Sequence, residues 1–196
     1  MPELSAPPWA TPLVGFRSRK AAQLCAYFAA KTAGVKSAGT IERLKLIKLL
    51  YFAERKFISE NHHPMLFDEY YSLEHGPICS SALDGINGII HGEIWDNYIA
   101  RNGNIVVAIK SLSRDELDEV SDAELSVVDD IWLKFGHMTP SQLRNYSHEN
   151  CPEYTETTGR IRITYKQILE AVGAEDADNL ANDIEGMIDL DVALSD

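Results

Sequence analysis

The chain has 196 residues, a length that suits a single domain, and hydrophobic residues make up 45% of it, enough for a core without disulfides. The formal net charge of −12 makes the chain as a whole a poor ligand for nucleic acid, because phosphate binding needs a basic stripe. No segment approaches the roughly 20 apolar residues that span a bilayer, and residues 1–8 lack the basic and apolar regions of a signal peptide, so we expect a cytoplasmic protein with no membrane partner.

The N-terminal residues 1–18 are expected to form an arm, because the first 17 residues hold four prolines and one glycine. A helix is predicted over 19–33, where alanines and Cys25 recur every three or four residues and create a small-residue face for close packing. Gly34 and Gly39 bracket a break before the next element.

A long helix is predicted from an N-cap at Thr40 to about Glu60. Leucines, isoleucines and Tyr51 form a broad apolar sector on its helical wheel, which predicts core packing. Cations surround one aromatic ring on the opposite side, which is either an ordinary solvated face or a contact surface with an anchor and a charged rim. The residues predicted to bind a partner are Lys45, Lys48, Phe52, Arg55 and Lys56.

The middle of the chain mixes extended and helical patterns. Residues 65–75 are rich in aromatic and β-forming side chains, with a strand expected near Tyr70–Leu73. A helix is predicted from Ser80 to about His91, ended by Gly92. A hairpin is predicted over 95–110, with strands either side of a turn at Asn102-Gly103.

The second half reads as helical, and polar pairs three residues apart mark the starts of its helices. Capping boxes are predicted at Ser121 with Glu124, Thr139 with Gln142, and Thr164 with Gln167. Ser113 with Glu116 fits the same pattern ahead of a short segment. The expected helices cover 121–136, 139–148, 164–172 and 176–190.

These elements predict a fold that is mostly α with a small β-hairpin, a compact helical domain with minor β content. The expected divisions are an arm at 1–18, a helical domain at 19–173, and an acidic C-terminal helix at 174–196. Charge is unevenly spread along the chain, because residues 1–60 hold ten Lys/Arg against four Asp/Glu, residues 113–130 hold eight acids and one base, and residues 174–196 hold eight acids and no base. Such separated surfaces suit the steering of a charged partner, although solvated faces give the same pattern.

The sequence contains no recognised catalytic or phosphate-binding motif. The three cysteines, Cys25, Cys79 and Cys151, are widely spaced and are expected to be partly buried free thiols. The spacing of the six histidines provides no convergent metal ligands. We therefore expect no enzyme activity, no cofactor and no metal, while a nucleophile built from Cys79 or Cys151 with a distant histidine stays open.

The helix segment Lys45-Leu46-Ile47-Lys48-Leu49-Leu50-Tyr51 resembles the opening signature of the Panacea domain, also called the SocA-like antitoxin domain. The family's second signature, a Gly-Pro segment after an extended stretch, is matched by His75-Gly76-Pro77-Ile78. A third feature, a helix ending in Thr-His, corresponds to Ser147-His148, without the family's following Trp. The resemblance covers about residues 20–150.

The resemblance implies an antitoxin that neutralises a cognate toxin by direct protein–protein binding, in some members as an adaptor that delivers the toxin to an ATP-dependent protease. It also implies that the signature residues serve the fold, with His148 expected to cap or hydrogen-bond within the domain. Those structural residues are Leu46, Leu49, Tyr51, Gly76, Pro77 and His148.

Two other functions remain open from the sequence. A DNA-binding transcriptional regulator would use the basic N-terminal region and the hairpin, with operator DNA as its partner. An uncharacterised enzyme would need a cleft holding a histidine or cysteine with a shifted pKa.

Overall fold

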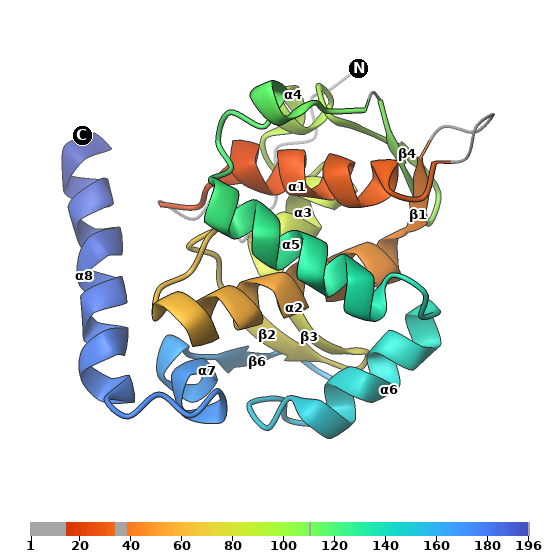
Figure 1. Cartoon of the computed structure of the whole chain (residues 1–196). Coiled ribbons are helices and arrows are strands. Elements are labelled where there is room, and N and C mark those ends of the chain that lie inside the picture. Colours follow the sequence, from red (N-terminus) through yellow and green to blue (C-terminus); the bar gives the residue numbers. More distant parts are fainter. Residues whose placement is uncertain (1–14, 34–38, 110, 196) are drawn as a thin grey trace, which may run out of the picture.

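The computed structural model describes residues 15–33, 39–109 and 111–195 of the chain. Most of the predicted arm, the break from Gly34 up to Gly39, and the last hairpin residue, Lys110, lie outside these ranges. Within them the chain forms eight α-helices and six short strands, so the predicted fold class of mostly α with minor β is confirmed (Figure 1). The β content is larger than one hairpin, because the strands make two three-stranded antiparallel sheets.

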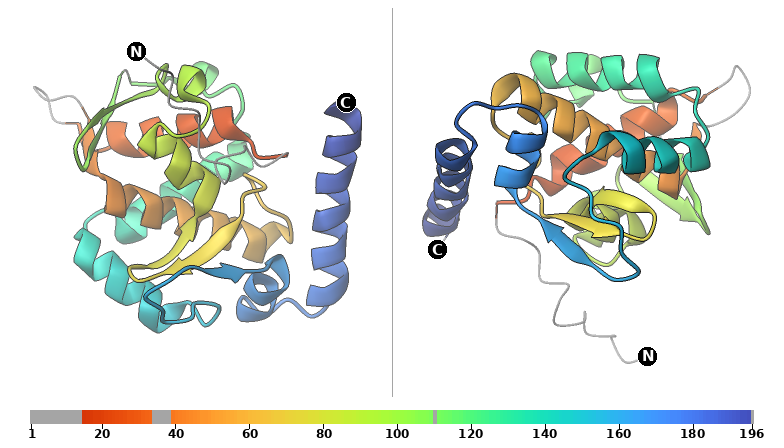
Figure 2. Two further views of the ribbon diagram at one scale, coloured as in Figure 1. Left: turned by 180° about the vertical axis from the view of Figure 1, so that it is seen from behind. Right: turned by 90° about the horizontal axis from the view of Figure 1, so that it is seen from below.

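Helix α2, Arg43–Asn61, lies at the centre of the molecule. It contacts α1, α5, α6 and α7 and also strand β3, so neighbours surround it on all sides (Figure 2). Leucine, lysine, arginine and glutamate make up eleven of its 19 residues, and all four favour the helical state. The helix ends where His62 adopts a left-handed conformation, with φ of 60°.

The predicted N-cap at Thr40 is wrong, because Thr40 belongs to strand β1, Thr40–Glu42, which pairs with β5. Glu42, in an extended conformation, precedes the first turn of α2 instead. Helix α1, Ser18–Ala30, contacts α2 among other elements, and of its predicted small side chains Ala22, Cys25 and Ala29 have no exposed surface.

The first sheet has the strand order β1-β5-β4. The predicted hairpin is present as β4, Ile99–Asn102, and β5, Ile105–Ala108, but its turn residues are Gly103 and Asn104 rather than Asn102 and Gly103. Only Gly103 of the two has a positive φ, 59°, the pattern of a type II′ turn. Trp95 is not in the hairpin but in the short helix α4, Gly92–Trp95, where it is fully buried.

The second sheet has the order β3-β2-β6 and brings distant segments together. Strand β2, Tyr70–Leu73, confirms the predicted strand, whereas β3, Gly76–Cys79, and β6, Ile161–Ile163, were not predicted. Helix α3, Ser80–Asn87, ends earlier than predicted, because Gly88 takes the left-handed conformation and Gly92 starts α4.

The C-terminal half follows the predicted capping boxes. Helices α5, Asp122–Phe135, α6, Pro140–Asn150, and α7, Tyr165–Ala171, each begin at one, and the boxes are confirmed in their hydrogen bonds. A single 3-10 turn, η1, Arg114–Glu116, follows the fourth box. Helix α8, Ala177–Ser195, extends past the predicted end at 190. None of the helices in the described ranges combines the length and the apolar character that a bilayer crossing needs.

Candidate partner-binding groove

The predicted basic face of α2 is largely covered, because α5 and α6 pack on that side of the helix. Lys48 has no exposed surface and Phe52 exposes only 4% of its own. The expectation of an exposed Phe52 ringed by cations is therefore wrong. A helical wheel assumes one buried side, whereas the polar side chains of this central helix find partners inside the protein.

Lys48 connects the two signature segments. Its Nζ donates a hydrogen bond of 2.7 Å to the carbonyl oxygen of Pro77. Gly76 has φ of +92°, and a Cβ there would lie 2.8 Å from Lys48 Nζ and 2.4 Å from Ser147 Oγ. Only glycine fits this turn without displacing its neighbours. Burial lowers the pKa of the Lys48 ammonium to about 7.

A second network joins α2 to the segment after α6. The Glu153 carboxylate, with no exposed side-chain surface, accepts hydrogen bonds of 2.7 Å from Tyr51 Oη and of 2.7 Å from Arg55 Nε. Burial and the nearby Glu153 charge raise the pKa of the Tyr51 hydroxyl. These contacts give Arg55 a structural role that the sequence could not reveal, because Glu153 lies 98 residues away from it. They add a hydrogen bond to the packing role expected of Tyr51.

A groove of about 690 Å³ lies between α2, α5 and α6, and we refer to it as the α2–α5–α6 groove. The Phe52 ring forms part of its floor, with ring centroids 4.9 Å from Phe135 and 5.5 Å from Tyr146. Leu133, 78% exposed, lies at its edge. Three of the five predicted partner residues line it, namely Phe52, Arg55 and Lys56.

The groove carries both signs of charge. Lys134 lies with its Nζ 5.0 Å from the centroid of Phe135. Lys56 pairs with Glu60 and, over 3.3 Å, with Asp130. Lys45 lies outside this lining and donates to the carbonyl oxygen of Gly136 over 2.6 Å. The apolar floor with charges around it is typical of a protein–protein contact.

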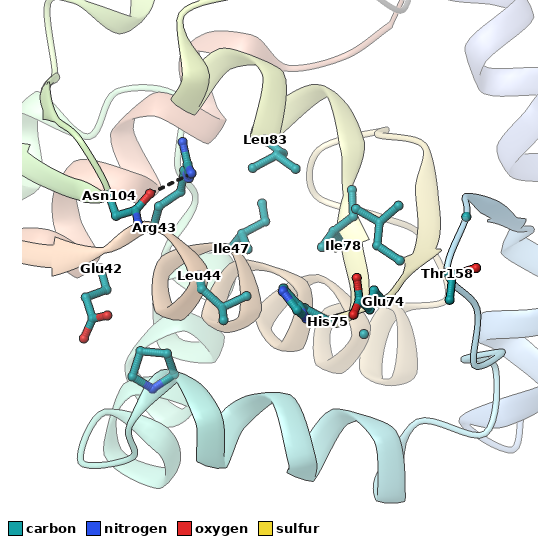
Figure 3. A pocket seen from close by; sticks show the side chains of 14 residues that line it. Glu42, Arg43, Leu44, Ile47, Glu74, His75, Ile78, Leu83, Asn104 and Thr158 are labelled. Atoms are coloured by element: carbon teal, nitrogen blue, oxygen red, sulfur yellow. Dashed lines mark hydrogen bonds between the residues drawn. The ribbon is translucent and has the colours of Figure 1, made fainter.

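A second pocket of about 600 Å³ lies where the start of α2 meets the β2–β3 turn. Figure 3 shows Leu44 and Ile47 of α2 facing Ile78 and Leu83, with His75 and Glu74 beside them. Arg43 closes one end by donating to the side-chain oxygen of Asn104 over 2.8 Å. Both signature segments line this pocket, so its shape is tied to the residues that define the fold.

His148 does not make the internal hydrogen bond that was expected of it. Its Nε2 is buried without a partner among the described residues, and its ring packs on Tyr154 with centroids 4.4 Å apart. Burial, together with the charges of Arg144 and Lys48, lowers the pKa of the imidazole. The ring therefore contributes packing in its neutral form.

The three free thiols are more buried than expected, with exposures of 0% for Cys25, 0% for Cys79 and 3% for Cys151. Burial raises the pKa of all three thiols, for Cys151 to about 12. Such thiols are protonated at neutral pH, which removes the support for a cysteine nucleophile. Within residues 15–33, 39–109 and 111–195, no His, Cys, Asp and Glu side chains gather in a set that could hold a metal ion.

Sequence reasoning missed the opposite wall of the groove and the buried acids. Glu54 accepts hydrogen bonds from Met65 N and Leu66 N, each of 3.0 Å, and from Tyr70 Oη. Asp68 accepts from the backbone N–H groups of Ser81 and Ala82 at the start of α3 and from that of Glu69. The position of Glu54 within an apolar segment is the one sequence signal that could have identified it as a buried acid. No local pattern indicates that Leu133 and Lys134 lie next to α2.

The family model described as antitoxin SocA-like, Panacea domain, matches residues 46–153, more than half of the chain. A search of curated proteins finds no match. A search of solved structures finds none either. The matched stretch contains the second signature segment and all of the first except Lys45. It covers α2 from Leu46 onward together with α5 and α6 around the α2–α5–α6 groove, and it stops before β6, α7 and α8. The chain belongs to the family of SocA-like Panacea domain proteins.

Proposed function

We propose that the chain is an antitoxin that neutralises a cognate toxin by direct protein–protein binding, in the cytoplasm and without catalysis. The observation that carries this proposal is the match of the antitoxin SocA-like Panacea domain to residues 46–153. The α2–α5–α6 groove lies within that stretch and supports a binding role, because it joins an aromatic floor to an exposed apolar edge.

The groove is our proposed contact surface for the toxin. Phe52 and Tyr146 form an apolar floor, exposed Leu133 provides an anchor, and Lys56 and Lys134 supply charge at the edge. Interfaces concentrate their binding energy in such a centre and leave charge at the rim. Lys48 is not part of this proposed contact surface, because it is wholly buried beneath the β2–β3 turn.

Co-expression with the adjacent open reading frame tests the function. The neighbour expressed alone is expected to stop growth, and this chain expressed with it is expected to restore growth and to co-purify with it. As a control, the protein encoded by the adjacent open reading frame has to be shown to be expressed and folded. Unhindered growth with that folded neighbour alone removes the proposal.

A pair of substitutions tests the groove. Leu133→Asp with Lys134→Glu places acids at its edge and is expected to weaken toxin binding at least about 30-fold, since apolar and charged contacts are lost together. The matched control is Ile109→Asp, a similarly exposed side chain at 51%, on the first sheet. Calorimetry on purified proteins measures both. Equal affinity in the two variants places the contact elsewhere.

Binding to operator DNA has less support in the structure. The N-terminal cations are largely engaged with acids, as in Arg19 with Asp118 at 2.6 Å and Lys20 with Glu124 at 2.6 Å. Phosphate contacts need cations that are free to pair. A gel shift on the upstream DNA at low salt tests this function, and a salt-dependent shift would establish it.

Delivery of the toxin to an ATP-dependent protease remains a separate proposal. Direct inhibition leaves the toxin level unchanged, whereas delivery shortens the toxin's lifetime in cells that hold the protease. Following the toxin level with and without this chain, in cells with and without that protease, separates the two modes.

A further inference from the structure

Helix α8 is anchored along one side only. Ala177, Ala181 and Ile184 are buried at its first turns, where α7 lies beside it (Figures 1 and 2). Further along, Asp191 pairs with Arg17 over 2.5 Å. Ile188 also packs against the core, and these contacts lie on the side of α8 toward the body of the protein. Within the described residues, Met187, Leu190 and Leu194 lie exposed on the remaining surface of the helix.

An exposed apolar stripe runs along one face of the C-terminal half of α8. Met187, Leu190 and Leu194 are spaced by three and four residues, which places them on one face of a helix. Their exposed fractions are 45%, 62% and 81%. The last nine residues of α8 hold four of the seven large apolar side chains that the described residues expose, so the exposure is concentrated rather than scattered.

The helix that carries the stripe is acidic, and Asp183 lies on the same face, four residues before Met187. Asp183, Glu185 and Asp189 are exposed on α8, and residues 174–196 contain eight acids without a single base. A second copy of this chain has the same net charge of −12 and is therefore repelled by this acidic surface. The surface is therefore complementary to an apolar groove whose edges carry lysine or arginine.

The family match ends at Glu153, so α8 lies outside the stretch that the family shares. A shared domain cannot by itself distinguish one partner from another, whereas an added element with its own apolar and charged pattern can. The position of α8 fits a contact that belongs to the particular partner of this chain.

We propose that the C-terminal half of α8 is a second docking surface for the toxin, inserting Met187, Leu190 and Leu194 into an apolar groove rimmed with basic side chains on that toxin. This inference rests on the proposed function, since it takes the toxin as the partner. It places part of the specificity outside the α2–α5–α6 groove.

The test uses the full chain and the purified neighbouring protein. Met187→Gln, Leu190→Gln and Leu194→Gln together keep good helix formers and remove the stripe. We expect the triple variant to bind at least about 30-fold more weakly, because three buried anchors are lost. Asp183→Asn, Glu185→Gln and Asp189→Asn together should slow association and flatten its dependence on salt. Ile109→Gln with Ile161→Gln is the control, with exposures of 51% and 41%.

Each outcome decides the inference. Wild-type binding with an unchanged triple variant overturns it and leaves the antitoxin function standing, whereas failure of the wild type to bind removes both. A triple variant that melts at a lower temperature when free shows that the stripe packs within the chain, which also overturns it. Sedimentation in which the wild type forms dimers and the triple variant does not assigns the stripe to self-association instead.

Discussion

Lys48 places an ionisable group in the middle of the core, where water cannot solvate its charge. It has no exposed surface, and its Nζ donates a hydrogen bond to the carbonyl oxygen of Pro77 in strand β3. An ammonium group in such a site loses hydration that one neutral carbonyl does not replace. Its contribution to stability should therefore depend on pH.

The pKa of Lys48, about 7 in the folded protein, lies below the value of about 10.4 for an exposed lysine. Between these values the unfolded chain binds a proton that the folded chain lacks, so stability rises with pH across that window. Lys48→Met is expected to remove this rise, which amounts to a slope of up to about 1.4 kcal/mol per pH unit. Urea unfolding of both proteins at pH 7, 8 and 9 measures it.

The matched control is Lys134→Met, which replaces an exposed lysine and should keep the wild-type slope. Parallel slopes in wild type and Lys48→Met would mean that Lys48 keeps its proton in the core. In that case the hydrogen bond to Pro77 would stabilise the charge more than burial opposes it.

For single residues, the sequence indicated which apolar side chains of α2 belong to the core, but it did not indicate which of its other side chains are exposed. Leu46, Leu49 and Tyr51, which were expected to be packing positions, have no exposed surface. The prediction for Phe52 and Lys48 failed because the segments that cover them come from elsewhere in the chain, and a helical wheel contains no term for them. These segments are residues 122–150 and, for Lys48, also the turn beside Pro77. The same reason hid Glu153 as the partner of Arg55.

At the scale of the element, locally encoded signals worked and non-local ones did not. The capping boxes that start α5, α6 and α7 need only residues three apart, and all three were predicted. Strand β6 forms because Ile163 pairs with Tyr70, more than 90 residues earlier in the sequence. Its three residues are too few to show a pattern that predicts a strand. The turn residues of the hairpin shifted by one because register is set by the pairing of both strands.

Gly186 gives a prediction for helix α8. It lies inside the helix, its φ is not positive, and a Cβ there would meet nothing within 4 Å. Glycine in a helix interior costs up to about 1 kcal/mol relative to alanine. Gly186→Ala should therefore raise the free energy of unfolding by roughly 0.5–1 kcal/mol, and amide exchange across the second half of α8 should slow.

The same substitution in α3 is the control. A Cβ on Gly85 would lie 2.0 Å from Trp95 Cε2, so Gly85→Ala should destabilise the protein through that clash. A Gly186→Ala protein that is no more stable than wild type, but whose exchange in α8 slows, would mean that α8 opens independently of the rest of the domain.

For the whole molecule, the question is where the domain ends. The predicted boundary at 173 remains a prediction, while the family match stops at 153. Beyond that point, β6 adds to the second sheet and α7 packs on α2. The residues after 153 therefore complete the core, and Glu153 lies at the junction between the matched stretch and this completion.

Glu153 is the side chain through which we expect the two parts to be coupled. Its carboxylate binds Tyr51 Oη and Arg55 Nε of the central helix, and no part of its side chain is exposed. Glu153→Ala leaves a buried hydroxyl and a part-buried guanidinium without that acceptor, so it should cost about 3–5 kcal/mol of stability. Glu153→Gln keeps one acceptor oxygen and should cost less. Urea unfolding measures both losses. If the two variants lose the same small amount, water replaces the carboxylate, and residues 154–173 are held by the packing of β6 and α7 alone.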